Sequence, residues 1–347
     1  MLRIGFVGAG IISWAHALGL HAMVEAGIIE AGITAVYDVD ADRAAGFAAV
    51  NGARAVSDLH QLLDACDAVY VCTPTAGHPD VVTAAAARGR AVFCEKPLAV
   101  DLAGAEALAL AARGIPAQVG LVLRSTPVFG ALRALVQSGD LGAVMAAVFR
   151  DDQYFPIQGM YGSLWRADVS AAGGGCLIEH SIHDLDILRY CLGEVRDVTG
   201  RTANYAGHDL IEDVATATLS FASGATATLV SVWHGILRRG STRRVEVFFE
   251  RGLAWLDRDV TGPLHIETDN GVEVRACPLA DWVQALPLAD DETGLAIRSY
   301  ASADRAFVDA VVHGRPTTPG LEEGVVAHRL VDAVYRSARA GGVPVAM

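Results

Sequence analysis

Short apolar runs alternate with helix-like stretches through residues 1–122. The runs that predict strands are residues 4–7, 34–37, 68–72, 91–94 and 118–121. Helical patterns lie between them, at residues 12–26, 59–65, 79–88 and 102–113. Strands that alternate with helices of this length are typical of βαβ units, in which the strands form one parallel sheet. The pattern therefore predicts a doubly wound α/β domain over residues 1–122.

The pattern of apolar and polar positions changes in the second part of the chain, residues 123–347. Two pairs of runs alternate with a period of two residues, and a short turn with glycine joins each pair. These runs are residues 215–221 with 225–233, and residues 245–249 with 253–257. Such pairs predict hairpins of an antiparallel sheet, and helical patterns at residues 297–312 and 321–339 close the chain. We expect a second α/β domain around an open, mainly antiparallel sheet.

One face of this second sheet is expected to stay without helices, because antiparallel sheets usually have one covered and one free face. Large aromatic side chains occur along the predicted strands: Phe221, Trp233, Phe248, Phe249 and Trp255. An uncovered face with such side chains favours a contact between subunits.

The composition excludes several classes of protein. Apolar residues make up 52% of the chain and charged residues 19%, which indicates a well-filled core and argues against disorder. The formal net charge of -13 disfavours nucleic acid and membrane surfaces as partners. Neither a membrane-spanning apolar run nor a signal peptide is recognisable. The 6 cysteines have no metal-binding or disulfide spacing, so we expect reduced thiols in a cytoplasmic protein.

A glycine-rich turn follows the first predicted strand and opens the first predicted helix. Gly8 permits a tight turn, and Gly10 lets the backbone approach a pyrophosphate. The first N–H groups of the helix, at Ile11 and Ile12, then face that anion. Ser13 stands where a third glycine is usual, and a small residue can serve there. An ordinary glycine turn has the same local pattern, but the place between strand and helix favours a dinucleotide site.

The expected nucleotide is NAD. Asp38 ends the second predicted strand, where its carboxylate can accept hydrogen bonds from the adenosine 2′- and 3′-hydroxyls and repel a 2′-phosphate. Alternatively, Asp38 caps the following helix, although Asp40 can do so by itself. Arg43 is close enough in sequence to assist a 2′-phosphate, so NADP stays open as the cofactor.

Further candidates for cofactor binding follow later strands. Thr73 and Pro74 end the strand at 68–72, on the carboxyl edge where open α/β sheets bind ligands. His78 begins the next helix and either contacts the cofactor or packs locally. Glu95 ends the strand at 91–94 and is expected on the same edge.

Lys96 is the only lysine among 27 Lys and Arg residues, and it leaves a buried strand at this edge. A lysine here can hold a substrate hydroxyl and stabilise negative charge on its oxygen. Unlike arginine, lysine can also change its proton affinity. Pro97 restricts Lys96 to an extended backbone, which directs the side chain. The alternative is a surface lysine before a turn; we predict a role in catalysis and in contact with cofactor and substrate.

A second group of ionisable residues follows three consecutive glycines at 173–175, in the helix predicted at residues 177–192. Glu179 and His183 are four positions apart, and His180 and His183 three, so they share a helix face. A neutral imidazole is suited to take a hydroxyl proton as hydride leaves, and Glu179 can orient it. A metal site and purely structural histidines are alternatives, although the spacing is not that of HExxH.

Aromatic and basic residues upstream of the glycines complete the candidates. Tyr154, Trp165 and Arg166 are suited to wall a hydroxyl-rich ligand, and we place Arg124 with them as a substrate-binding residue. Trp165 and Arg166 are also candidates for contact with the cofactor. All of these residues are equally typical of core and rim positions.

The order of these motifs resembles the glucose–fructose oxidoreductase/inositol dehydrogenase (Gfo/Idh/MocA) family over nearly the whole chain. The resemblance implies an N-terminal Rossmann domain and a C-terminal α/β domain whose open sheet mediates homodimers or homotetramers. It also implies NAD(P)-dependent oxidation or reduction of a sugar, polyol or sugar derivative. The family's Glu-Lys-Pro lysine, which contacts substrate and nicotinamide ribose before an often cis bond to proline, falls on Lys96. The proposed acid/base histidine of its glycine-rich pattern falls on His183.

Two positions depart from the family pattern. Glu179 stands where the family has aspartate, and Ser181 where it has glycine. His180 adds a second imidazole. The identity of the substrate is therefore not transferable from the family.

Together these observations predict a dehydrogenase that passes hydride between a carbinol carbon and the nicotinamide, with Lys96, His183 and Glu179 as catalytic residues. The expected substrate is a cyclic polyol, a sugar or a sugar derivative, and no metal is expected. One alternative is a dinucleotide-binding sensor or regulatory protein without turnover. Another is a metal-assisted lyase or isomerase that acts on an oxidised sugar.

Overall fold

Two units share the chain in the computed structural model, which describes residues 1–260 and 262–347. Within these residues, one unit comprises Met1–Val122 with Ala280–Val325, and the other Leu123–Leu279 with Val326–Met347. The sequence analysis predicted one domain over residues 1–122 and a second over residues 123–347. Residues 280–325 differ from the prediction, which assigned them to the second domain, because they fold back onto the first unit.

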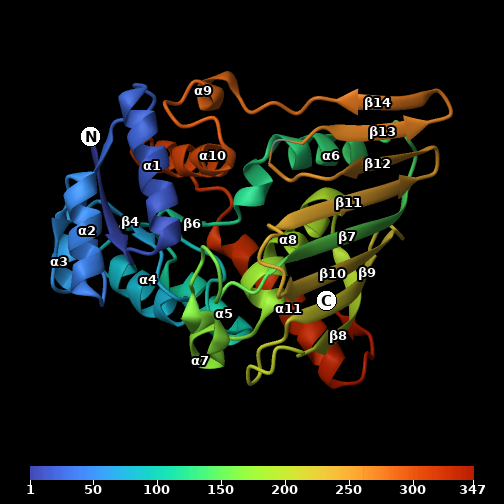
Figure 1. The fold of residues 1–347 in the computed structure, drawn as a ribbon, viewed down its shortest axis with the longest axis horizontal. Coiled ribbons are helices and arrows are strands. Elements are labelled where there is room, and N and C mark those ends of the chain that lie inside the picture. The colour runs from blue at the N-terminus through green and yellow to red at the C-terminus, as the bar shows by residue number, and fades with distance from the viewer. Residues whose placement is uncertain (261) are drawn as a thin grey trace. The chain divides into compact units, whose positions relative to one another are not determined.

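The first unit is built on a parallel sheet (Figure 1). Its strands lie in the order β3-β2-β1-β4-β5-β6, and every neighbouring pair is parallel. Their bounds are β1 (Leu2–Val7), β2 (Ala31–Tyr37), β3 (Arg54–Ala55), β4 (Ala68–Val71), β5 (Ala91–Cys94) and β6 (Ala117–Val119). This is the strand order of a Rossmann fold. The predicted parallel sheet is confirmed, and β3 was missed because it has only 2 residues.

Helices cover both faces of this sheet. The helices of this unit are α1 (Ile11–Glu25), α2 (Ala41–Asn51), α3 (Leu59–Ala65), α4 (His78–Ala86), α5 (Leu102–Ala111), α9 (Asp281–Gln284) and α10 (Glu292–Val312), of which α9 contacts α10. On one face, stacked rings from neighbouring strands form a row in which Tyr70 lies 5.0 Å from Phe6 and 4.8 Å from Phe93. Phe307 of α10 packs edge-on against this row. This aromatic contact explains why the segment with α10 belongs to the first unit.

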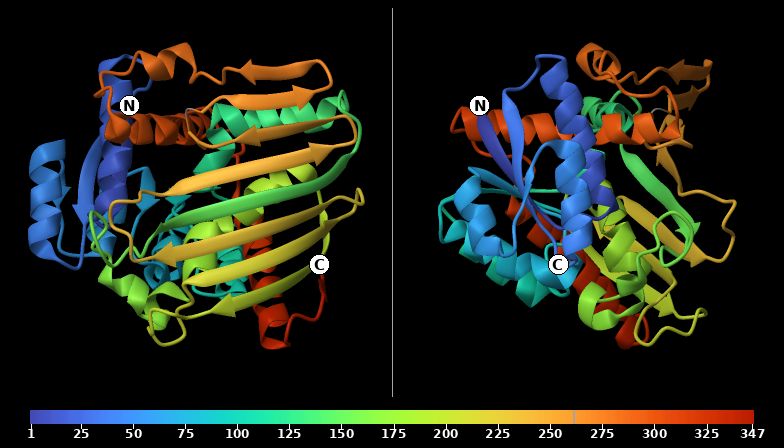
Figure 2. Two further views of the ribbon diagram at one scale, coloured as in Figure 1. Left: turned by 45° about the vertical axis from the view of Figure 1, so that its right-hand side comes forward. Right: turned by 60° about the vertical axis from the view of Figure 1, so that its left-hand side comes forward.

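The second unit contains a broad, mainly antiparallel sheet (Figure 2, left). Its strands lie in the order β14-β13-β12-β11-β7-β10-β9-β8-β15. Among the described residues of this second sheet, only the β7–β10 pair is parallel. Their bounds are β7 (Val144–Tyr154), β8 (Val195–Ala203), β9 (Val214–Phe221), β10 (Thr226–His234), β11 (Thr242–Phe249), β12 (Gly252–Leu256), β13 (Leu264–Thr268), β14 (Gly271–Arg275) and β15 (Val345–Ala346). Both predicted hairpins, β9–β10 and β11–β12, are confirmed.

Helices of the second unit lie on one face of its sheet (Figure 2). They are α6 (Pro127–Ser138), α7 (Val169–Ala172), α8 (Ile182–Leu192) and most of α11 (Leu321–Arg339). The strands alternate accordingly, so that Ala215, Ala217, Leu219 and Phe221 of β9 are buried. Among the aromatic residues expected on the free face, this corrects the placement of Phe221, Trp233 and Phe249, which are buried in the core. Phe248 and Trp255 are only partly covered.

Two further expectations concern the chain as a whole. All six cysteines lie in the described residues as unpaired thiols, and five of them are buried, as predicted. Among the helices that the structure describes, none combines the length and apolar character needed to cross a membrane.

Candidate active site

The glycine turn of the first unit has the geometry of a phosphate-binding loop. Gly8 has a φ of 93°, and a Cβ atom there would lie 2.6 Å from the Cys72 carbonyl oxygen, so only glycine fits. Gly10 precedes α1, and no described atom lies within 4 Å of the place where its Cβ would be. No described side chain caps α1, so its first N–H groups face open space beside Gly10. Ser13 donates a 2.7 Å hydrogen bond to the Gly8 carbonyl and fastens the turn.

Asp38 is held next to this turn. Its carboxylate accepts hydrogen bonds from the N–H groups of Ala9, at 2.7 Å, and Asp40, at 2.8 Å. Asp40 caps α2 and also accepts a hydrogen bond from the Arg43 guanidinium at 3.0 Å. The cap is therefore Asp40, which leaves Asp38 at the strand end, whereas Arg43 is engaged by Asp40. This arrangement fits a ribose with free hydroxyls better than a 2′-phosphate.

The buried side chain of His78 connects two backbone segments at the carboxyl edge of the sheet. Its Nδ1 atom lies 2.7 Å from the Pro97 carbonyl oxygen, and its Nε2 atom 3.0 Å from that of Thr73. The ring is buried, so it links the segments that follow β4 and β5. We expect His78 to influence the cofactor through the backbone of these two segments. Thr73 and Pro74 lie in the segment that follows β4.

Lys96 lies two residues after the end of β5, on the edge that carries the glycine turn, because the strands of a parallel sheet end on one side. The Lys96–Pro97 peptide bond is cis, as the family resemblance implies. Leu98, which follows Pro97, is fully buried. The side chain of Glu95 is mostly buried and contacts His16 instead of projecting freely toward a ligand.

In the second unit, the glycine run packs against Glu212. A Cβ atom on Gly175 would lie 1.8 Å from the Glu212 carbonyl oxygen, so this position excludes any side chain. The Glu212 carboxylate accepts hydrogen bonds from the N–H groups of Gly175 and Leu177, and from the Tyr335 hydroxyl. Burial raises the pKa of Glu212, although each of these three hydrogen bonds lowers it. Sequence reasoning missed Glu212, whose partners lie more than thirty positions away.

The predicted helix at 177–192 is not one regular α-helix, which corrects the sequence analysis. Residues Leu177–Ser181 form a π-helical turn, and α8 begins at Ile182. A π turn holds more residues per turn, so the three- and four-residue spacings do not place side chains on one α-helical face. Single π turns often occur at functional sites, where they redirect side chains.

Several predicted binding residues meet in this unit. Arg166 donates to the buried Glu179 carboxylate over 3.1 Å, and its guanidinium lies 4.4 Å from the Trp165 ring centroid. The rings of Tyr154 and Tyr161 pack with centroids 5.5 Å apart. Burial raises the pKa of Tyr161, which therefore stays a neutral hydrogen-bonding group. An ion pair beside aromatic surface is suited to a ligand with both polar and apolar faces.

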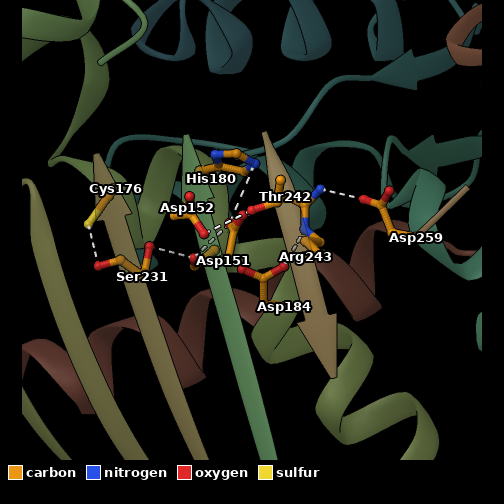
Figure 3. A network of polar contacts seen from close by, with 10 residues as sticks. Asp151, Asp152, Cys176, His180, Asp184, Ser231, Thr242, Arg243 and Asp259 are labelled. Carbon is orange, nitrogen blue, oxygen red and sulfur yellow. Dashed lines mark hydrogen bonds and ion pairs between the residues drawn. The ribbon is translucent and has the colours of Figure 1, made fainter. Parts of the chain in front are cut away.

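His180 contacts a buried network of charges (Figure 3). Its Nε2 atom lies 3.5 Å from Asp151 Oδ2, on β7. The same carboxylate accepts a hydrogen bond from Ser181, whose hydroxyl also lies 2.6 Å from that of Ser231. Two of the three positions that add to or depart from the family pattern, His180 and Ser181, thus meet on Asp151.

The network has more carboxylates than cations. Arg243 of β11 donates to Asp184, at 2.8 Å, and to Asp259, at 2.7 Å, and lies 3.6 Å from Asp151 (Figure 3). Burial alone would lower the pKa of Arg243, but these carboxylates raise it, so the guanidinium stays charged. Burial raises the pKa of Asp151 well above its usual value, against the attraction of Arg243. Asp151 and Asp184 thus share the single guanidinium of Arg243.

His183 lies on the first turn of α8 and is buried. Arg124, predicted to bind substrate, instead donates to both oxygens of Asp186 at 2.8 and 2.6 Å and stacks over Tyr190. Its guanidinium is mostly buried, so it supports the segment with His183 and its substrate role stays a prediction. Within the described residues, no group of three or more His, Cys, Asp or Glu side chains is arranged to hold a metal ion.

Comparison with known families agrees with both units. The model of the oxidoreductase family with an NAD-binding Rossmann fold matches residues 2–121, and that of the GFO/IDH/MocA C-terminal domain matches residues 129–254. The chain belongs to the Gfo/Idh/MocA oxidoreductase family. Its first unit is thus the NAD-binding domain of an oxidoreductase, as the sequence analysis predicted.

Individual members of the family are similar over nearly their full lengths. Inositol 2-dehydrogenase of Rhizobium meliloti (strain 1021) is 28% identical, over 97% of this chain and 96% of the relative. 1,5-Anhydro-D-fructose reductase of Ensifer adhaerens is 29% identical, over 98% of this chain and 97% of the relative. The crystal structure of GenD2 from gentamicin A biosynthesis in complex with NAD has a TM-score of 0.81 and 27% identity, covering 100% of this chain and 96% of that one.

Proposed function

We propose that this oxidoreductase transfers a hydride between NAD and a carbinol carbon of a sugar, a cyclic polyol or a sugar derivative. In the oxidative direction the carbinol loses a hydride to the nicotinamide and a proton to the protein, and leaves as a ketone or lactone. Two observations about relatives support the substrate class: one similar protein is an inositol dehydrogenase and another an anhydro-sugar reductase.

The observation that carries this proposal is the position of the single lysine. Lys96 follows β5 on the same sheet edge as the glycine turn after β1 and Asp38 after β2. This is the edge at which open α/β sheets bind a dinucleotide. A lysine there can bind the substrate oxygen and stabilise its negative charge as the hydride leaves.

The second unit supplies the proposed proton acceptor. His183 takes the hydroxyl proton in this proposal, because an imidazole is the side chain that most readily exchanges a proton near neutral pH. Glu179 binds a substrate hydroxyl or orients the imidazole, and the hydrogen bond from Arg166 holds its carboxylate in place. His180 and Tyr154 are proposed to contact further hydroxyls of the ligand.

The residues of the first unit fit the nicotinamide cofactor. When bound, NAD supplies the hydride acceptor, and the open first turn of α1 beside Gly10 would bind its pyrophosphate. Asp38 would accept hydrogen bonds from the adenosine ribose. Because Arg43 is paired with Asp40, we propose a preference for NAD over NADP.

A substrate panel tests the proposed reaction. Purified protein is incubated with NAD and with inositols, aldohexoses or anhydro-sugars, and formation of reduced nicotinamide is followed by its absorbance. We expect turnover with at least one cyclic polyol or sugar and none with a simple alcohol such as ethanol. Measurable binding of NAD without turnover on any member of the panel, in either direction, would instead indicate a dinucleotide sensor. Metal-dependent loss of the sugar without net formation of reduced nicotinamide would favour a lyase or isomerase.

We also propose that the protein assembles through the uncovered face of the second sheet. Val148 of β7 and Phe248 of β11 are exposed there, on two adjacent strands. Trp255 lies on the same sheet and stacks on His265 at 4.8 Å. Burial of such side chains between two copies favours a stable dimer. Light scattering should give the mass of a dimer or tetramer for the wild type, and a smaller species for V148D/F248D; a monomeric wild type would contradict this proposal.

A further inference from the structure

A buried histidine lies between two carboxylates in the first unit. The Nδ1 atom of His16, on α1, lies 2.7 Å from Asp304 Oδ1, on α10. The Nε2 atom of the same ring lies 3.0 Å from Glu95 Oε1. The His16 and Asp304 side chains are fully buried, and that of Glu95 is 10% exposed. Such a cluster of buried ionisable groups has a structural cost, so its position beside Lys96 points to a role.

Each of the two contacts needs a proton, because a carboxylate oxygen and a bare ring nitrogen are both acceptors. Burial disfavours a charged imidazole, but Asp304 and Glu95 outweigh it and raise the pKa of His16 to about 10. Because this pKa lies above the ordinary 6.5, the stabilisation from the charged ring is complete below about 6.5 and is lost as the pH rises through about 10. At neutral pH the His16 ring is therefore positively charged where it contacts Asp304 and Glu95.

The other groups around His16 are aromatic rings and weak acids that stay neutral, so His16 is the centre of the cluster. The rings that pack against it, with centroids 5.2, 5.0 and 5.3 Å away, are Tyr70, Phe93 and Tyr300. Burial raises the pKa values of nearby weak acids, which therefore stay neutral at neutral pH: Tyr70, Cys72 and Cys94. Burial also raises the pKa of Asp304, and the attraction of the His16 ring offsets only part of this rise.

The cluster reaches the main chain of Lys96 through Glu95. The Oε2 atom of Glu95 accepts a hydrogen bond from the Lys96 N–H at 3.3 Å, while Oε1 faces His16. Gly120 packs against the same carboxylate, since a Cβ atom there would lie 2.7 Å from Oε1. The carboxylate thus contacts the His16 ring and the Lys96 N–H. Gly120 leaves room for it because glycine has no side chain.

We propose that Asp304 and His16 are positioning residues that hold the Glu95 carboxylate in one orientation and so fix the main chain from which Lys96 projects. This inference rests on the catalytic role proposed for Lys96. His16 and Asp304 act through Glu95 and touch no reactant. A shift of about 1 Å in a catalytic group can cost ~100-fold in rate. We therefore expect the loss of the His16 contact with Glu95 to lower the rate, although His16 itself is buried inside the domain.

His16→Gln and Asp304→Asn test the proposal by kinetics, and His21→Gln is the matched control. His21 lies on the same helix but is exposed, with Asn51 as its partner. With the panel substrate that the wild type turns over fastest, we expect kcat to fall ~10- to 100-fold in the first two variants. We also expect an altered pH profile of kcat, an unchanged KM for NAD, and wild-type values for His21→Gln. The double variant should be no slower than either single variant, because both remove the same anchor.

Two outcomes of the kinetics contradict the proposal. One is wild-type kcat in a folded His16→Gln protein. The other is a fall of kcat that follows a lower melting temperature while the pH profile of the remaining activity is unchanged. That second result would indicate that the cluster only stabilises the fold.

A second measurement needs no turnover. Lys96 is the only lysine, so protein labelled with carbon-13 lysine gives an NMR signal from that side chain alone. We expect one sharp signal in the wild type and in His21→Gln, and a shifted or split signal in His16→Gln. An unchanged Lys96 signal in His16→Gln, or a neutral His16 ring in the wild type at neutral pH, would overturn the inference. A wild type that turns over no panel substrate would overturn only the proposed function.

Discussion

Lys96→Arg should lower kcat about 100-fold or more while the protein still folds and binds NAD. Arginine keeps the positive charge, but its guanidinium is larger, is planar and does not lose its proton at accessible pH. A lysine ammonium can lie against a single oxygen and adjust its proton affinity, and these properties belong to general acid–base and electrostatic catalysis. The measurement is steady-state kinetics with the best panel substrate, together with NAD affinity by calorimetry.

Arg113→Lys is the matched control for this substitution. Arg113 is exposed at the end of α5 in the same unit, so exchange of the two cations there should leave kcat and NAD affinity unchanged. Lys96→Met removes the charge as well and should be at least as slow as Lys96→Arg. Full activity in Lys96→Arg would exclude the proposed role of the lone lysine.

His183→Gln should lower kcat by about 100-fold or more, because general acid–base catalysis by one side chain contributes about 10²- to 10⁴-fold. Glutamine can still form hydrogen bonds, so substrate binding should suffer less than turnover. The pH dependence of the remaining activity should lose the limb that reports the histidine, since the variant needs hydroxide or water as its proton acceptor. Initial rates across pH, with NAD saturating, measure both effects.

Two other histidines separate this role from a general effect of losing an imidazole. His313 lies on the surface at the end of α10, so His313→Gln should behave as the wild type. His180→Gln should raise KM for the substrate more than it lowers kcat, because His180 is proposed to contact a substrate hydroxyl. If His180→Gln were the slower enzyme and His183→Gln nearly normal, the acid/base would be His180 and the proposed assignment would be wrong.

Local sequence patterns predicted most of the parallel sheet of the first unit, but neither β3 nor the place of α10 in this unit. Each βα unit there is made of residues that follow one another closely, so short apolar runs and the glycine turn at Gly8 predict the strands and the dinucleotide site. The same holds for the β9–β10 hairpin, which a short turn closes. β7 was missed because its second half, from Arg150 to Gln153, is polar and yet mostly buried. Within this stretch, the buried Asp151 and Asp152 have charged partners far away in sequence, Arg243 and Arg239.

The site divides in the same way. Lys96, Glu179, His180 and His183 were recognisable as chemical groups from residue type and local spacing. The partners that set their orientation were not, since Arg243 lies 59 positions from Asp184 and Asp304 lies 288 positions from His16. Periodicity carries no signal for such contacts. A buried charge is tolerated only after the fold has brought a partner of opposite sign to it, so the sequence around Asp151 or His16 alone cannot show it.

The sequence by itself determined which groups are present: a glycine turn that excludes side chains, a carboxylate at the second strand end, and one lysine at the fourth predicted strand. It did so because those properties depend on residues a few positions apart. The tertiary structure decided what holds these groups. It returned α10 to the first unit and so placed Asp304 against His16, and it wound residues 177–181 into a π turn beside Asp151. The physical reason is that orientation and proton affinity depend on neighbours in space, and folding alone chooses those neighbours.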